Sequence, residues 1–255
     1  MTKQCKKGNN DYTTGIKEID DMIGGIKKGS NILLIGPSMS GKETISNHII
    51  YDNESKNENA VLVVTTCEPG IKILERIRKR EPNLSLSRVG LVDCVSIKYG
   101  SEAVENENIK FVNGPEDLTA IGVKISQFLD DFVMKKKIQK IQLHINSLST
   151  LLMYSNIQRV FRFLHVLTGR IKMVNALGIY VIDSKMHDKQ LITAIKLLCD
   201  GMIEIKSDND RNFLRTAGLE HTSWLEYQIE KENVIIVKDN RTYARNVTKS
   251  VGACA

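Results

Sequence analysis

Residues 31–50 constrain the fold of this chain more than any other segment, because they join an apolar run to a glycine-bounded loop. Residues 31–35 are mostly apolar and lie between Gly29 and Gly36, a pattern typical of a buried strand. The loop that follows fits the spacing G-x-x-x-x-G-K and ends at Lys42. Residues 44–50 continue as a plausible helix. A strand, a tight loop and a helix are therefore expected in immediate succession.

This loop has the residue types that phosphate binding needs. Glycines let the backbone turn tightly around phosphate oxygens, and the N–H groups at the start of the next helix face the anion. A lysine at the end of the loop reaches the terminal phosphates as a point charge. We therefore predict that a nucleotide binds at the following residues: Gly36, Pro37, Ser38, Met39, Ser40, Gly41, Lys42, Glu43 and Thr44.

Strand-like and helix-like segments alternate from about residue 30 to residue 200. Apolar runs of strand length recur at 60–64, 89–95, 140–145 and 178–182, and apolar residues recur at helical spacing at 16–23, 71–77, 157–171 and 189–198. We expect a further helix that opens at Pro115 and a polar loop at 105–110. The alternation predicts an α/β fold with a mainly parallel sheet flanked by helices on both faces. β-rich segments up to about residue 238 predict hairpins near the C-terminus.

The composition favours one large domain. Hydrophobic residues make up 42% of the 255 residues, enough for a substantial core. We expect a flexible N-terminus at 1–12, a single nucleotide-binding domain at 13–238 and a flexible tail at 239–255.

The same composition indicates a cytoplasmic protein without membrane insertion. No apolar run approaches the length of a membrane span, and the N-terminus has no apolar signal core. The five cysteines are widely scattered and none pairs with another at metal-ligand spacing, which indicates reduced thiols.

The net charge of +6 leaves DNA binding open. Basic residues cluster at 76–80 and 135–137, which would suit nucleic acid, but acidic residues are interspersed throughout. We favour ordinary solvated helix faces as the explanation of these clusters over a DNA-binding surface.

Several segments together resemble the RecA/KaiC-like P-loop ATPases, particularly the archaeal KaiC-like and RadA-paralogue proteins. Residues 14–30 are similar to the N-terminal signature of that family, and the phosphate loop follows at the family's spacing. Weaker similarity is found at 63–69, 145–152 and 213–221. The resemblance covers roughly residues 13 to 237. It implies a RecA-like core, ATP and Mg²⁺ as ligands, and assembly as a homo-oligomer or with related KaiC-like subunits.

The resemblance also assigns roles to residues outside the loop. Glu68 matches a catalytic glutamate that orients or deprotonates a water. Asn146 stands where the family has the Walker B aspartate, which supports Mg²⁺ through water. Glu43 replaces the serine or threonine whose hydroxyl normally binds Mg²⁺. Cys67 replaces the first of two glutamates often found in the family, and Arg215 keeps one of two late cationic residues.

These departures fall on the groups that hold magnesium. An amide offers Mg²⁺ a weaker oxygen than a carboxylate does. The carboxylate of Glu43 could repel the phosphates, bind the ion and restore the lost charge, or pair with Lys42. We therefore predict an ATP-binding KaiC-like regulatory or assembly protein with weak or absent hydrolysis. The alternatives are a DNA-binding recombination or repair accessory ATPase of the RadA-paralogue type, and a true RecA-like ATPase in which Glu43 binds the metal.

Purely structural roles remain open for the same residues. Glu68 could cap a helix, and Asn146 could be a polar strand end. Arg215 on a β-segment is more often a solvated edge charge. We expect packing roles for four further residues: His48, His144, Trp224 and Tyr227.

Overall fold

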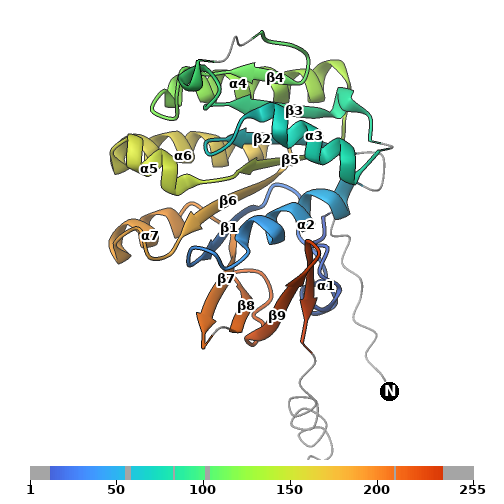
Figure 1. Ribbon diagram of the computed structural model, residues 1–255, viewed down its shortest axis with the longest axis vertical. Helices are drawn as coiled ribbons and strands as arrows, with labels where there is room; N and C mark the ends of the chain where they lie inside the picture. Colours follow the sequence, from blue (N-terminus) through green and yellow to red (C-terminus); the bar gives the residue numbers. More distant parts are fainter. Residues whose placement is uncertain (1–11, 55–58, 83, 101–103, 210, 238–255) are drawn as a thin grey trace, which may run out of the picture.

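The computed structural model describes residues 12–54, 59–82, 84–100, 104–209 and 211–237, without the side chains of 52–54. The expected tail at 239–255 and residues 1–11 of the expected N-terminal segment lie outside these ranges. The described strands form one ten-stranded sheet in the order β10-β9-β8-β7-β1-β6-β5-β2-β3-β4. Figure 1 shows this sheet running from β4 at the top of the view to the hairpins at the bottom.

The strands of the sheet divide into a parallel core and an antiparallel extension. The parallel strands are β1 (Asn31–Gly36), β2 (Asn59–Thr65), β3 (Val89–Asp93), β4 (Ile109–Phe111), β5 (Lys140–Ile145), β6 (Leu177–Asp183) and β7 (Gly201–Asp208). The antiparallel extension consists of β8 (Arg211–Ala217), β9 (Leu225–Glu230) and β10 (Asn233–Ile236), which follow β7. The predicted C-terminal hairpins are therefore confirmed.

Helices cover both faces of the sheet, as predicted. One face carries α4 (Leu118–Asp130), α5 (Leu148–Tyr154), α6 (Ile157–Met173) and α7 (Lys189–Lys196). The other face carries α1 (Lys17–Ile23), α2 (Lys42–Glu54) and α3 (Gly70–Arg80). Because parallel strands alternate their side chains between two covered faces, almost every residue of β1, β2 and β6 is buried.

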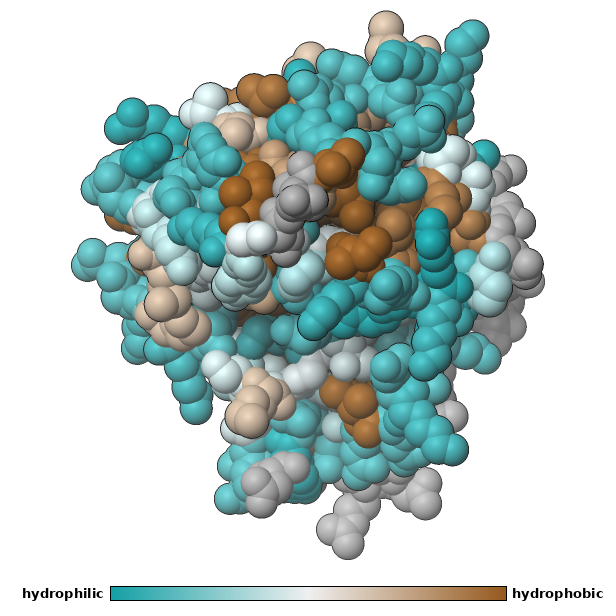
Figure 2. Space-filling view, turned by 45° about the horizontal axis from the view of Figure 1, so that its top comes forward, coloured by the Kyte–Doolittle hydropathy of each residue, from teal (hydrophilic) through white to brown (hydrophobic). Residues whose placement is uncertain are grey.

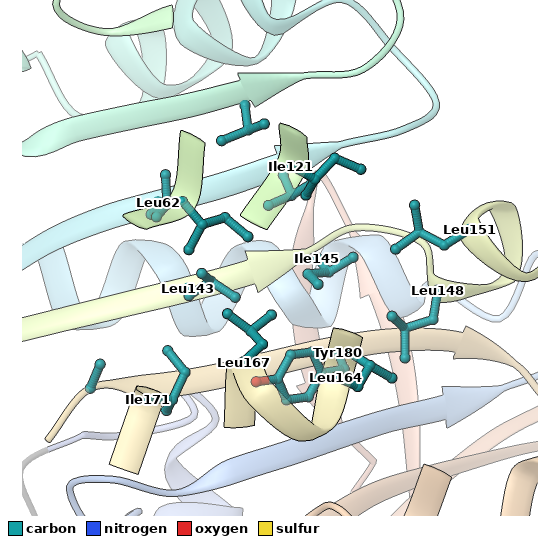
Figure 3. Close-up of a cluster of buried hydrophobic side chains, with 14 of the residues drawn as sticks. Leu62, Ile121, Leu143, Ile145, Leu148, Leu151, Leu164, Leu167, Ile171 and Tyr180 are labelled. Carbon is teal, nitrogen blue, oxygen red and sulfur yellow. The ribbon is translucent and has the colours of Figure 1, made fainter. Parts of the chain in front are cut away.

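The largest core lies between the sheet and helices α4 to α7. Its helix residues recur every three or four positions, as at Leu164, Leu167 and Ile171, and so face the sheet together. Figure 3 shows them packed against side chains of the central strands, including Leu143 of β5 and Tyr180 of β6. This packing fixes the strand ends from which the candidate site is built.

Three local expectations were wrong: the bounds of a polar loop, the first residue of a helix and, as described in the next paragraph, the start of the folded domain. Residues 109–111, within and after the expected polar loop, form the edge strand β4, where Ile109 is buried beside Leu91. A single buried residue in so short a strand gives no alternation that a sequence could show. Helix α4 begins at Leu118 rather than Pro115, because the side chain of Asp117 accepts a hydrogen bond from Ala120 N–H.

Tyr12 belongs to the folded domain, although we expected it in the flexible N-terminus. It is fully buried, and its backbone pairs with Ile26. Its hydroxyl donates to the carbonyl of Ile141 and accepts from the N–H of the same residue, both at 3.0 Å. The first segment is thus attached to the amino end of β5.

The described helices include none that is long and apolar enough to cross a membrane. Figure 2 shows hydrophilic side chains over most of one face, with apolar side chains gathered mainly in its upper half.

Candidate functional site

The predicted phosphate loop lies at the carboxyl edge of the parallel strands. Strand β1 ends at Gly36 and α2 begins at Lys42, so the strand, loop and helix follow one another as expected. Strand β1 lies between β6 and β7, in the middle of the sheet. The carboxyl ends of β2 and β5 meet the same edge and bring Glu68 and Asn146 toward α2. Glu43, Glu68 and Asn146 line one cavity of about 310 Å³.

Two glycines of the loop are required by close packing. A Cβ at Gly36 would lie 2.7 Å from Cβ of Ile205, which is too close for any side chain. Gly41 has φ of +78°, and a Cβ there would collide with the side chain of Ile229. Ile205 belongs to β7 and Ile229 to β9, so the last parallel strand and the antiparallel extension together fix the path of the loop.

The backbone of the loop offers a row of hydrogen-bond donors. In the described part of the chain, no acceptor is found for the backbone N–H groups of residues 38–44. The first N–H groups of a helix have no acceptor within the helix, and they carry the positive end of its dipole. Together with Lys42, these donors fit an anion such as a phosphate group.

The side chain of Lys42, the first residue of α2, is held by hydrogen bonds to the start of the loop. Its Nζ donates to the carbonyl of Gly36 at 2.9 Å and also to the carbonyl of Pro37. The same nitrogen lies 3.4 Å from Oδ2 of Asp183. Burial lowers the pKa of Lys42, while the charges of Asp183 and Glu43 oppose that shift. The ammonium is therefore positioned before any ligand arrives.

Asp183, the last residue of β6, is a site residue that we did not single out from the sequence. Its carboxylate accepts hydrogen bonds from the hydroxyl of Ser38 and from the N–H of Lys185, the latter at 2.9 Å. Burial raises the pKa of Asp183, but these hydrogen bonds and Lys42 outweigh burial and lower it. Only the strand order, which places β6 directly beside β1, brings this carboxylate to the loop.

The amide of Asn146 ties β5 to the end of β2. Its Oδ1 accepts from the N–H of Thr66 at 3.0 Å and from the hydroxyl of Thr66 at 3.1 Å. Its Nδ2 donates to Oγ1 of Thr65 at 3.2 Å, and that hydroxyl donates to the carbonyl of Glu68. Because the hydroxyl of Thr65 already donates elsewhere, its partner at position 146 has to be a donor, which a carboxylate is not.

Glu68 forms an ion pair with Arg76 of α3. Both side chains are about one-third exposed, at 36% and 38%. Cys67, beside Glu68, is exposed, and its sulfur lies 3.4 Å from Oγ1 of Thr150. The carboxylate expected to act on water is thus paired with a cation instead.

Glu43 is exposed in the first turn of α2 and makes no ion pair within the described residues. The pairing with Lys42 that we considered is replaced by the pairing of Lys42 with Asp183. Glu43 is therefore the site carboxylate still available to a ligand.

The side chains do not form a ready magnesium site. No group of three or more histidine, cysteine or acidic side chains in the described part of the chain could hold a metal ion. Mg²⁺ prefers oxygen ligands in strict octahedral geometry. Of the two predicted ligands, Asn146 has its oxygen engaged by Thr66, and only Glu43 has an available oxygen. The role of Asn146 toward the metal stays a prediction.

Three of the four residues for which we expected packing roles make contacts inside the fold, while Trp224 is partly exposed beneath Lys206 and Arg215. His144 is fully buried between Ser46 and Gln142, and burial lowers its pKa to about 3. His48 accepts a hydrogen bond from the N–H of Val234 at 2.9 Å. Tyr227 is buried, and its hydroxyl donates to the carbonyl of Ser40 in the phosphate loop. Tyr227 therefore also supports the site, which its place in the sequence did not show.

Arg215 is satisfied within its own chain. Its guanidinium donates to Glu204 at 2.8 Å and 2.6 Å and lies 4.5 Å from the ring centre of Trp224. Glu204 faces Arg215 directly in the β7–β8 ladder.

The strand, glycine loop and helix define this chain as a P-loop protein of the α/β class. A model of a family of unknown function, DUF7504, matches residues 29–205, more than half of the chain, so the chain belongs to this family. No curated protein matches it. A solved structure with the same fold is a KaiC-like protein from the hyperthermophilic archaeon Pyrococcus horikoshii OT3, with a TM-score of 0.67 and 16% identity. The match covers 89% of this chain and 98% of that one, and confirms the predicted RecA-like fold.

Proposed function

We propose that this protein binds ATP at residues 36–44 and acts as a KaiC-like regulatory or assembly protein with weak or absent ATP hydrolysis. The observation that carries the proposal is a contrast within one site. The loop presents N–H groups that have no acceptor among the described residues and a positioned Lys42. By contrast, Glu68 and Asn146, two of the three groups expected to act on water or metal, are engaged by neighbours.

The engaged groups account for slow hydrolysis. Phosphoryl transfer depends mainly on positioning and on charge stabilisation at the terminal phosphate. The ion pair with Arg76 engages one oxygen of the Glu68 carboxylate and weakens it as a base toward water, and the oxygen of Asn146 supports a metal only after it leaves Thr66. Mg²⁺, when bound with ATP, would neutralise phosphate charge, and Glu43 is the side chain placed to hold it.

ATP would then act as a ligand that orders subunits rather than as a fuel. The resemblance to KaiC-like proteins supports a homo-oligomer or an assembly with related subunits. Cys67, Cys94 and Cys199 form no disulfide within the described residues, which agrees with the cytoplasmic location that we propose.

Release of phosphate from Mg-ATP by the purified chain tests the catalytic part of this proposal. We expect turnover well below about 1 s⁻¹, the lower end of ordinary enzyme rates. The same sample in a light-scattering cell shows whether ATP drives assembly. Turnover at ordinary rates that is lost in Lys42→Ala would contradict weak hydrolysis, and unchanged scattering on addition of ATP would contradict the assembly role.

DNA binding is not favoured by the structure. In the 76–80 cluster, Arg76 pairs with Glu68, and Arg80 pairs with Glu232. In the 135–137 cluster, two lysines pair with one aspartate, Asp131. These ion pairs offset part of the basic charge, while Arg78, Lys79 and Lys137 have no ion pair among the described residues. Neither cluster is therefore a continuous unpaired basic surface of the kind that phosphate backbones favour.

A further inference from the structure

A carboxylate already engages two of the groups expected to hold phosphate. Oδ2 of Asp183 accepts a hydrogen bond from the hydroxyl of Ser38 and lies 3.4 Å from Nζ of Lys42. The side chains of Lys42 and Asp183 are only 12% and 8% exposed. Water therefore screens this pair less than it screens pairs on the surface.

The position of Asp183 is fixed from several sides. Its N–H donates to the buried hydroxyl of Ser149 at 2.9 Å, and its Oδ1 accepts from the N–H of Lys185. Asp183 is aligned with Gly36 in the β1–β6 ladder, and the N–H of Ser184 donates to the carbonyl of Gly36 at 2.8 Å. The backbone bonds hold the residue in place, and rotating its carboxylate away from the loop would break the hydrogen bonds from Ser38 and from the N–H of Lys185.

A bound phosphate would have to lie close to this carboxylate. A phosphate oxygen that accepts a hydrogen bond from Lys42 at about 2.9 Å lies at most about 6 Å from Oδ2 of Asp183. Two like charges at that separation repel appreciably in a partly buried site. In loops of this kind the backbone N–H groups hold the α- and β-phosphates, while the lysine reaches the β- and γ-phosphates. The repulsion therefore acts on the β- and γ-phosphates, and it is larger for a triphosphate, which brings one more charged phosphate group to the lysine.

We propose that Asp183 competes with the γ-phosphate for Lys42 and Ser38, so that the loop holds a nucleoside diphosphate at least as tightly as the triphosphate. This inference rests on the proposed nucleotide binding and adds its selectivity. Asp183 is then a specificity-determining residue, and the ratio of diphosphate to triphosphate sets the state of the site.

Calorimetric titration of the full chain with Mg-ADP and Mg-ATP tests the inference, with Asp183→Asn as the variant. Asparagine keeps the shape and the acceptor for Lys185 N–H but removes the charge. We expect Asp183→Asn to tighten ATP binding by about tenfold and ADP binding by less than about threefold. In the unmodified protein, Kd for ADP should be no larger than Kd for ATP.

Asp200→Asn is the matched control. Asp200 also binds a lysine, Lys172, and a backbone N–H of β1, that of Asn31, but it lies at the opposite end of that strand. The substitution Asp200→Asn should leave the affinities for ADP and ATP unchanged. If Asp183→Asn fails to fold, as judged by thermal melting, Asp183→Ser supplies a second neutral side chain for the same titrations.

The outcomes separate the inference from the proposed function. Binding of nucleotide with the same ADP-to-ATP ratio in the unmodified protein and the Asp183 variant would overturn the inference alone. A clear preference of the unmodified protein for ATP would do the same. If neither the unmodified protein nor any of the variants binds ADP or ATP, both the proposed function and this inference are overturned.

Discussion

At the scale of single residues, the groups available to a ligand are those whose side chains do not already bind a neighbouring residue. Lys42 is positioned by backbone carbonyls that leave the loop N–H groups without an acceptor among the described residues, which supports the phosphate-binding role that we propose for it. Asn146 and Glu68 are engaged elsewhere, by Thr66 and Arg76. Asn146, which differs from the family pattern, and Glu68, which matches it, therefore both form structural contacts, whereas Glu43 makes no ion pair within the described residues.

Asn146 gives a prediction at this scale. Replacing it with aspartate removes the donor to Thr65 and adds a charge close to Glu68. Asn146→Asp should lower the free energy of unfolding by about 1 kcal/mol, because one hydrogen bond to the buried hydroxyl of Thr65 is lost. Urea denaturation measures the change.

Asn156→Asp is the control for that experiment. Asn156 caps α6 by accepting from the N–H of Arg159, a role that aspartate fills equally well. Its stability should change little. Equal stability of Asn146→Asp and the unmodified protein would show that the amide of Asn146 is not required.

At the scale of elements, the antiparallel extension supports the phosphate loop. Tyr227 and Ile229 of β9 contact the loop at Ser40 and Gly41, and β10 is bonded to α2 through His48. The loop is thereby held between the parallel core and the hairpins. We therefore expect the C-terminal strands to affect binding, although they lie far from the loop in sequence.

Tyr227→Phe tests this support. The substitution removes only the hydroxyl that donates to Ser40, so stability should fall by about 1 kcal/mol and ATP affinity by a few fold. Tyr180→Phe is the matched control, because its hydroxyl donates to Asn31 at the amino end of β1, away from the loop. Thermal melting and ATP titration of both variants give the comparison. An equal loss of affinity in both would show that β9 has no specific effect on the loop.

At the scale of the whole molecule, the sequence predicts the architecture better than the site. The alternating strands and helices and the loop at 36–44 are local patterns, and the structure contains them where expected. Asp183 could not be found in this way, because its proximity to Ser38 depends on β6 lying between β1 and β5. The engagement of Glu68 by Arg76 likewise depends on how α3 packs beside the end of β2. Strand order and helix packing are set by long-range contacts that no local spacing records.

The central claim is that residues 36–44 hold ATP through Lys42 and the loop N–H groups. Calorimetric titration of ATP into the full chain and into Lys42→Ala tests it most directly. The structure predicts saturable one-site binding by the unmodified protein and at least about tenfold weaker binding by the variant, since a charged hydrogen-bond donor to phosphate is lost. Equal affinity of the two proteins, or no binding by the unmodified protein, would contradict the claim.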